Sequence, residues 1–167
     1  NKIIDAIRSG VIKIEPFAEG DVGAASIDFH LGNEFKRLVS VGRPVLVDEE
    51  KSDDAQYSDL IVLREGETIA INPGETILGI TKEKLTLPPD IAGRIEGRSR
   101  FARVGLSVHI TSGFIHPGAS NTQVLEISNL SPNQLVLKPG LSICQIVLER
   151  CEGEAVYSGK FQGQMKP

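Results

Sequence analysis

Residues 96–103 gather the side chains with the clearest potential for chemistry. The segment reads EGRSRFAR, so three arginines and a serine follow Gly97 closely. Guanidinium groups form paired hydrogen bonds with phosphate oxygens, and a glycine lets backbone N–H groups approach an anion. The segment therefore predicts a site for a small polyphosphate.

A single carboxylate interrupts the apolar run VLEI at residues 124–127. In a strand, Glu126 shares one face with Val124, while Leu125 and Ile127 share the other. Two interpretations stay open: an exposed glutamate paired with a lysine, or a general base that accepts a proton from water. Burial would raise its pKa and a nearby arginine would lower it.

Other titratable residues suggest structural roles. Asp28 is predicted to hold a turn through side-chain to backbone hydrogen bonds, and His109 and His116 to line a pocket or support the fold. The zinc deaminase signature H-x-E followed by P-C-x-x-C is absent. The P-loop, the Rossmann glycine fingerprint and the G-x-S-x-G elbow are absent as well. Any deamination by this chain must activate water without zinc, and we expect no metal ligands from the protein.

The composition points to one cytoplasmic domain. The chain has 167 residues and a formal net charge of -4, which gives no reason to expect nucleic acid as a partner. Two cysteines form no disulfide framework, and no membrane-spanning run or signal peptide is visible.

The hydrophobic pattern predicts a short helix at the start and many short strands after it. Ile3, Ile4 and Ile7 have helical spacing and precede Gly10. Strands are expected at 25–31, 34–39, 60–63, 68–71, 76–81, 91–96, 107–111, 123–128, 134–137 and 141–149. Residues 43–58 read as a mobile loop. Such spacing favours an all-β sandwich or barrel.

Motifs along nearly the whole chain resemble the dCTP deaminase branch of the dUTPase superfamily. In order they are SIDFHLGN (26–33), PG (73–74), LP (87–88), IEGRS (95–99), GLSVHIT (105–111), VLE (124–126) and YSGKFQGQ (157–164). None is specific alone, but together they are.

The resemblance implies a mainly β fold, a distorted barrel or β-clip of the dUTPase-like type with a short N-terminal helix. It implies one domain over residues 1–167, in which 153–167 form a C-terminal tail that closes the site. It also implies a homotrimer with active sites between subunits and feedback inhibition by dTTP, with residues 109–112 as the switch.

The reaction implied is hydrolytic deamination of dCTP to dUTP and ammonia, in the supply of dUMP and dTTP, with Mg²⁺ bound through the substrate triphosphate. Carried over by position, Glu126 is the general base and proton shuttle, while Ser99 and Arg103 orient the water and keep Glu126 ionised. The implied substrate-binding set also contains Arg98, Arg100, Phe101 and Ala102 at the triphosphate, His116 at the deoxyribose, Val124 and Leu125 at the base, and Tyr157, Lys160 and Gln164 over the phosphates.

The chain departs from the family pattern on the sugar side of the site. His116 stands where the family usually has the aspartate of I-D-P-G, and residues 119–122 lack the usual aromatic and glycine. Arg100 replaces the second serine of G-R-S-S. In the dUTPase branch that aspartate activates water for phosphate cleavage, so His116 argues against a pyrophosphatase. Two alternatives stay open beside the deaminase: a dUTPase or bifunctional enzyme that releases pyrophosphate, and a non-catalytic deoxynucleotide-binding trimer.

Overall fold

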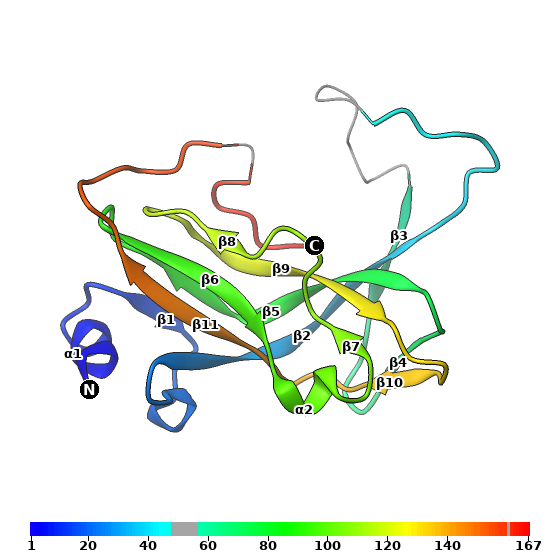
Figure 1. The fold of residues 1–167 in the computed structure, drawn as a ribbon, viewed down its shortest axis with the longest axis horizontal. Coiled ribbons are helices and arrows are strands. Elements are labelled where there is room, and N and C mark those ends of the chain that lie inside the picture. Colours follow the sequence, from blue (N-terminus) through cyan, green and yellow to red (C-terminus); the bar gives the residue numbers. More distant parts are fainter. Residues whose placement is uncertain (48–56, 160) are drawn as a thin grey trace.

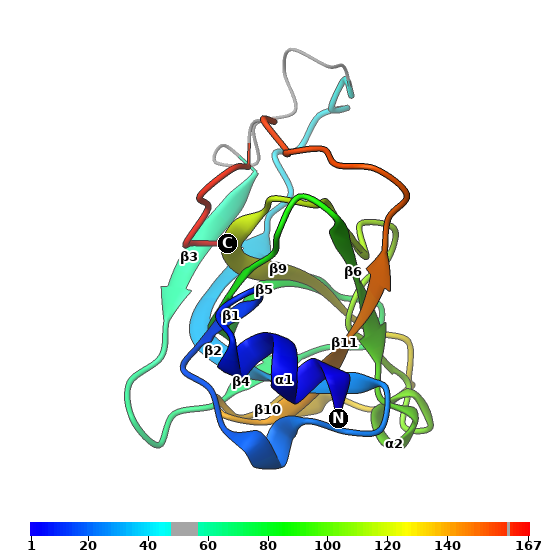
Figure 2. The same cartoon turned by 90° about the vertical axis from the view of Figure 1, so that its left-hand side faces the viewer.

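A computed structural model describes residues 1–47, 57–159 and 161–167 of the chain as one curled β-sheet with little helix. The sheet curves around its core in a half-barrel (Figures 1 and 2). The helical elements are α1 Lys2–Arg8, the 3₁₀ turn η1 Glu19–Asp21 and α2 Ser99–Ala102. The strands are β1 Lys13–Glu15, β2 Ser26–Leu38, β3 Ser58–Val62, β4 Ile69–Ile71, β5 Thr76–Thr86, β6 Ile91–Gly97, β7 Leu106–Ser107, β8 Phe114–Ile115, β9 Ser120–Asn129, β10 Leu135–Leu137 and β11 Ser142–Arg150.

The nine-stranded sheet follows the order β7-β9-β5-β2-β11-β6-β8, with β1 paired to β5 and β3 paired to β2. All of these strand pairs are antiparallel, and β10 and β4 form a separate two-stranded sheet. The predicted mainly β fold with a short N-terminal helix is therefore confirmed. Among the described residues, no helix is long and apolar enough to cross a membrane.

Strand β2 lies in the middle of the sheet and is longer than predicted. Two strands were expected, separated at Gly32 and Asn33, but one strand runs through both. A side chain at Gly32 would come within 2.9–3.0 Å of Ile80, so only glycine permits this close crossing of two strands. The first part of β2 pairs with β11 and the rest with β5 and β3, which joins the two halves of the sheet.

Strand β5 also continues past the predicted end at Thr81. In the added part of the strand, Glu83 is buried with 4% of its surface exposed. Its carboxylate accepts a 2.8 Å hydrogen bond from the His30 N–H and lies 2.7 Å from His30 Nδ1. Because these contacts satisfy the carboxylate, the strand tolerates a buried acid.

The core lies inside the curl and is mainly aliphatic. Alternate residues of β2 point inward, and Phe29 and Phe35 are both fully buried. Leu125 and Ile127 on β9 and Ile146 on β11 are also fully buried. The predicted strand at 107–111 is wrong beyond Ser107, and β1 and β8 were not predicted. Of the loop predicted at 43–58, residues 48–56 lie outside the described residues, and Ser58 begins β3.

Candidate active site

Glu126 projects from β9 toward a segment that has left the sheet. One carboxylate oxygen, Oε2, accepts hydrogen bonds from the backbone N–H of Ile110 at 2.7 Å and of Thr111 at 3.0 Å. Strand β7 pairs with the end of β9, so the chain after β7 is carried past Glu126. The strand expected at 107–111 is replaced by a bend that aims its N–H groups at the carboxylate.

These contacts set the charge of Glu126. Burial alone would raise the pKa of the carboxyl, but the hydrogen bonds from Thr111 and Ile110 and those from Ser112 together outweigh it and lower the pKa from 4.5. A carboxylate with a lowered pKa is ionised at neutral pH, which is the form that accepts a proton. The alternative of an exposed glutamate paired with a lysine is not what the described contacts show.

The arginine-rich segment forms α2 and its two ends. Arg98 precedes the helix in an extended conformation, Ser99 is its first residue, and Arg103 follows its last. Ser99, Arg100 and Arg103 are exposed, whereas Phe101 packs against the core and so fixes the helix to the body of the protein. The exposed face of α2 therefore presents two guanidinium groups and a hydroxyl together.

Arg98 is directed elsewhere. Its guanidinium pairs with the Asp28 carboxylate on β2 and the Ser142 hydroxyl on β11. Asp28 was predicted to hold a turn; instead it lies within a strand and pairs with Arg98, because β11 places β2 and β6 on either side of itself. A half-buried, paired arginine is a fixed positive group at the entry to α2 rather than a free one.

The structure does not bring Glu126 together with the rest of its predicted catalytic set. Within residues 1–47, 57–159 and 161–167, no hydrogen bond or ion pair joins its carboxylate to Ser99 or Arg103. The charge of Glu126 is instead maintained by the N–H groups of residues 110–112. Within one chain, Glu126 and the arginine segment are therefore not in direct contact through any described hydrogen bond or ion pair.

A hollow of about 270 Å³ lies beside α2 and is lined by Gly97, Ala102, Gly105, Leu106, Ser107, Val108, His109 and Leu130. It links the arginine segment to the chain that reaches Glu126. His109 lines this hollow, and its Nδ1 is buried near Gly113 with no hydrogen-bond partner among the described residues.

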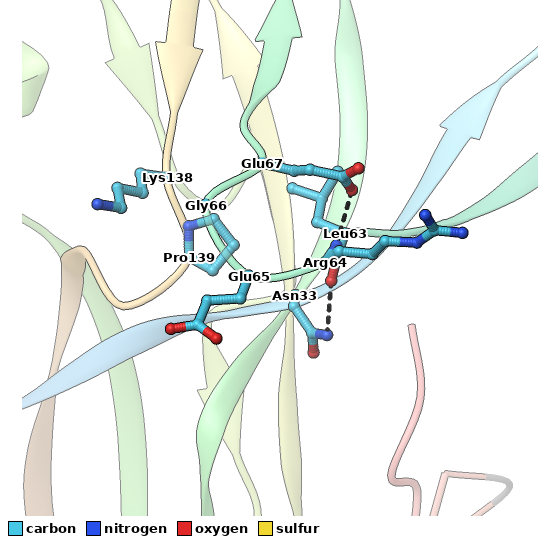
Figure 3. Close-up of a pocket in the computed structure, with 8 residues that line it drawn as sticks. All are labelled: Asn33, Leu63, Arg64, Glu65, Gly66, Glu67, Lys138 and Pro139. Atoms are coloured by element: carbon cyan, nitrogen blue, oxygen red, sulfur yellow. Dashed lines mark hydrogen bonds between the residues drawn. The ribbon is translucent and has the colours of Figure 1, made fainter.

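A larger hollow of about 500 Å³ lies near Asn33, Gly66 and Pro139 and contains none of the predicted site residues. Figure 3 shows that Lys138 and Arg64, two of the residues that line it, extend away from each other. Small-molecule sites need polar groups that converge. The smaller hollow beside α2 is the better candidate.

The remaining predicted residues lie on β9 or near its start. Val124 is half-buried and Leu125 is fully buried in the core, so Leu125 could reach a ligand only through its backbone. His116 lies in the turn before β9 and stacks on Tyr157, with ring centroids 5.0 Å apart. The Gln164 carbonyl accepts a 3.1 Å hydrogen bond from the Thr122 N–H. Lys160 lies outside the described residues.

The two ends of the predicted site lie far apart in the sheet. Figures 1 and 2 both place α2 at one end and the C-terminal residues at the other. The C-terminal residues lie along the first half of β9 of their own chain, through hydrogen bonds to Asn121 and Thr122. One chain therefore cannot close its own tail over its own α2 in this conformation.

Cys144 is not a candidate nucleophile. Burial, followed by the charges of Glu83 and Asp28, raises its pKa to about 12 against the opposing effect of Arg98. The thiol stays protonated at neutral pH, and a thiol is a poor nucleophile compared with its thiolate.

Sequence reasoning missed the partners of the charged groups. The pairing of Asp28 and Ser142 with Arg98 joins residues 70 and 44 positions apart, and no local pattern connects them. The N–H donors at Ile110 and Thr111 carry no side-chain signal at all. They follow from the pairing of β7 with β9, which ends at Ser107 and Ser128, two residues from Glu126.

Comparison with known proteins agrees with the geometry. A family model described as dCTP deaminase-like matches residues 1–151. A protein of Methanobrevibacter smithii named dCTP deaminase, dUMP-forming, is 33% identical over 99% of this chain and 89% of its own length. A protein of the same name from Corynebacterium diphtheriae is 37% identical over 97% of this chain and 89% of its own length.

The fold matches as well. The crystal structure of 2'-deoxycytidine 5'-triphosphate deaminase from Agrobacterium tumefaciens superposes with a TM-score of 0.69 at 20% identity. The match covers 90% of this chain, and this chain spans 47% of that one. At that identity the likeness supports the fold alone, but the family model and the two relatives extend over most of the sequence. The chain belongs to the dCTP deaminase-like family.

Proposed function

We propose that this protein deaminates dCTP hydrolytically to dUTP and ammonia. The observation that carries the proposal is the Glu126 carboxylate, which the N–H groups of Ile110 and Thr111 hold ionised beside a bend of the chain. Membership of the dCTP deaminase-like family supports the choice of dCTP.

The proposed step uses Glu126 as a proton shuttle. Glu126 takes a proton from water as the water oxygen bonds to C4 of the cytosine ring. The same carboxyl then gives the proton to the amino nitrogen, the C4–N bond breaks and ammonia leaves. The proton of the hydroxyl group now on C4 passes to ring nitrogen N3, so that C4 becomes a carbonyl and both protons of the water are placed. One group can do both because the two proton transfers are sequential. The absence of the zinc deaminase signature supports a water activated by Glu126.

Positive groups would hold the triphosphate. Arg100, Arg103 and the Ser99 hydroxyl are exposed together on α2 and suit phosphate oxygens. Mg²⁺ enters in this proposal with the triphosphate, as part of the substrate. Arg98 would instead hold the start of α2 in place, because its guanidinium is paired with the Asp28 carboxylate.

The activity of the enzyme should persist to an unusually low pH. A carboxyl whose pKa is lowered stays ionised at every pH above that pKa and loses its function as a base only below it. We expect kcat/KM for dCTP to be level from neutral pH down to about 4.5 and to fall as the pH drops through the lower pKa of Glu126. An acid limb centred well above pH 4.5 in an enzyme that is still folded would contradict this assignment.

We further propose that each site forms between two subunits of a homotrimer. The separation of Glu126 from Arg103 within one chain, and the opposite positions of α2 and the C-terminal residues, support a site completed by a neighbour (Figures 1 and 2). Inhibition by dTTP belongs to the same proposal, with residues 109–112 as the moving part because they hold Glu126.

Subunit complementation tests the shared site. Trimers of Glu126→Gln alone or Arg103→Ala alone should be nearly inactive. In a cyclic trimer assembled at random from equal amounts of both, about a quarter of the sites should unite an intact Glu126 with an intact Arg103 and recover activity. Mixing Glu126→Gln with Glu126→Ala is the control and should recover nothing. No recovery in the first mixture would place both residues in the same subunit's site.

A second candidate product is dUMP. The two relatives named above are both called dUMP-forming, which favours a further hydrolysis of dUTP to dUMP and pyrophosphate. His116, in place of the family's usual aspartate, argues against that second step. Incubation with dCTP and Mg²⁺, without added zinc, followed by assays for nucleotides, ammonia and pyrophosphate separates the cases. Ammonia with dUTP supports the first candidate, ammonia with dUMP and pyrophosphate the second, and bound but unchanged dCTP a binding protein.

A further inference from the structure

The C-terminal residues 155–159 and 161–167 are held against the turn that leads into β9. The Tyr157 N–H donates to the Pro117 carbonyl at 3.0 Å, and the Gln162 side chain donates to the Gly118 carbonyl at 3.3 Å. Farther along, the Thr122 N–H donates to the Gln164 carbonyl at 3.1 Å. We call these residues the C-terminal segment. Figures 1 and 2 both show its end beside β9.

Three rings meet where the segment reaches the turn. His116 lies between the other two: it stacks on Tyr157 at 5.0 Å with an interplanar angle of 8°, and Phe114 meets it edge-on at 4.9 Å and 90°. Both distances fall in the range of favourable aromatic contacts. Because Phe114 comes from β8, the cluster connects the C-terminal segment to the sheet.

The Tyr157 ring is also fixed from within the segment. A side-chain carbon at Gly159 would lie 2.3–2.5 Å from Tyr157 ring atoms, so the backbone of Gly159 lies directly against the ring. The Tyr157 hydroxyl accepts a 3.4 Å hydrogen bond from the Phe161 N–H. The orientation of this ring therefore sets the path of the chain that follows it.

We propose that His116 is a positioning residue that anchors the C-terminal segment through Tyr157. This role rests on the proposed function and depends on the ring at position 116, which the aspartate usual in the family cannot supply. If the segment contacts the substrate phosphates, an anchored segment loses less freedom when the nucleotide binds. Loss of the anchor should then weaken substrate binding more than it slows the chemical step.

Two variants separate the ring from the polar atoms of histidine. His116→Ala removes the stack, whereas His116→Phe keeps a flat ring on Tyr157. Since an aromatic contact of this kind shifts an equilibrium by about two- to tenfold, amide exchange in residues 155–159 and 161–165 should accelerate by about that factor in His116→Ala. The KM for dCTP should rise by a similar factor with a smaller change in kcat. His116→Phe should restore most of both properties.

Tyrosine fluorescence gives a readout that does not depend on turnover. The chain has two tyrosines and no tryptophan, so Tyr57→Phe leaves Tyr157 as the single emitter. In that background, His116→Ala should lower the fluorescence anisotropy of Tyr157, and His116→Phe should not.

Three results would overturn the proposed role of His116. Unchanged exchange and anisotropy in His116→Ala would overturn the anchor, and faster exchange with an unchanged KM would overturn its role in positioning. A failure of His116→Phe to restore protection would also overturn the role of the ring. If the wild-type protein does not turn over dCTP, the proposed function fails, while exchange and anisotropy still decide whether His116 anchors the segment.

Discussion

Replacement of Glu126 by glutamine should lower kcat for dCTP deamination by about 10²- to 10⁴-fold, the usual contribution of a general acid–base group. Both N–H groups of residues 110 and 111 donate to the same carboxylate oxygen. A glutamine whose amide oxygen occupies that position keeps both hydrogen bonds but cannot accept the proton. The variant therefore removes the chemistry and leaves the local structure in place.

Single-turnover measurements with dCTP and Mg²⁺ would test this expectation. Affinity for dCTP should change little, because the loss lies in the chemical step. Glu96→Gln is a matched control: it changes another half-buried glutamate, one that lies on β6 and has no part in the proposed mechanism. Turnover by Glu126→Gln within a few-fold of wild type would remove Glu126 from its proposed role.

Gly105→Ala should destabilise the protein by about 2–5 kcal/mol, from the strain of a left-handed backbone and from overpacking. Gly105 has a φ of +84°, and a side-chain carbon there would lie 2.6–3.0 Å from Ser131. Ser131 cannot retreat easily, because its N–H and hydroxyl donate to the Asn129 side chain at 2.9 and 2.8 Å. Asn129 itself is fully buried.

Gly140→Ala isolates the contact from the backbone strain. Gly140 has nearly the same φ, +85°, but nothing lies within 4 Å of an added side-chain carbon. Gly140→Ala should therefore lower the free energy of unfolding only by the cost of the left-handed backbone, about 1–2 kcal/mol. Urea unfolding at one fixed protein concentration measures both variants. Equal losses would mean that the contact with Ser131 contributes nothing.

Gly105→Ala should also reduce deaminase activity. Gly105 follows Arg103 by two residues, and its carbonyl accepts a 2.8 Å hydrogen bond from the Leu130 N–H. A shift here moves the end of α2 and the arginine that we place at the substrate. Activity should therefore fall in Gly105→Ala and persist in Gly140→Ala, measured where both are folded.

Local sequence patterns predicted most strands because alternation and turn residues act over a few positions. The helix before Gly10, the strand at 91–96 and the β-rich fold were predicted in this way, and α1, β6 and the antiparallel sheet confirm them. The patterns failed where a distant contact overrides local preference. The predicted strands ended at Leu31 and Thr81, but Gly32, which lies close to Ile80, and Glu83, which pairs with His30, both lie within strands.

By itself, the sequence determined the residue types for the proposed chemistry: an isolated carboxylate, a cluster of arginines with a serine, and a family resemblance that covers the chain. Only the tertiary structure decided their partners. In the structure, the Glu126 carboxylate accepts hydrogen bonds from backbone N–H groups, Arg98 pairs with Asp28, and His116 stacks on Tyr157. The reason is physical: hydrogen bonds and ring contacts are made across strands whose pairing depends on the whole sheet, and backbone donors leave no mark in the sequence.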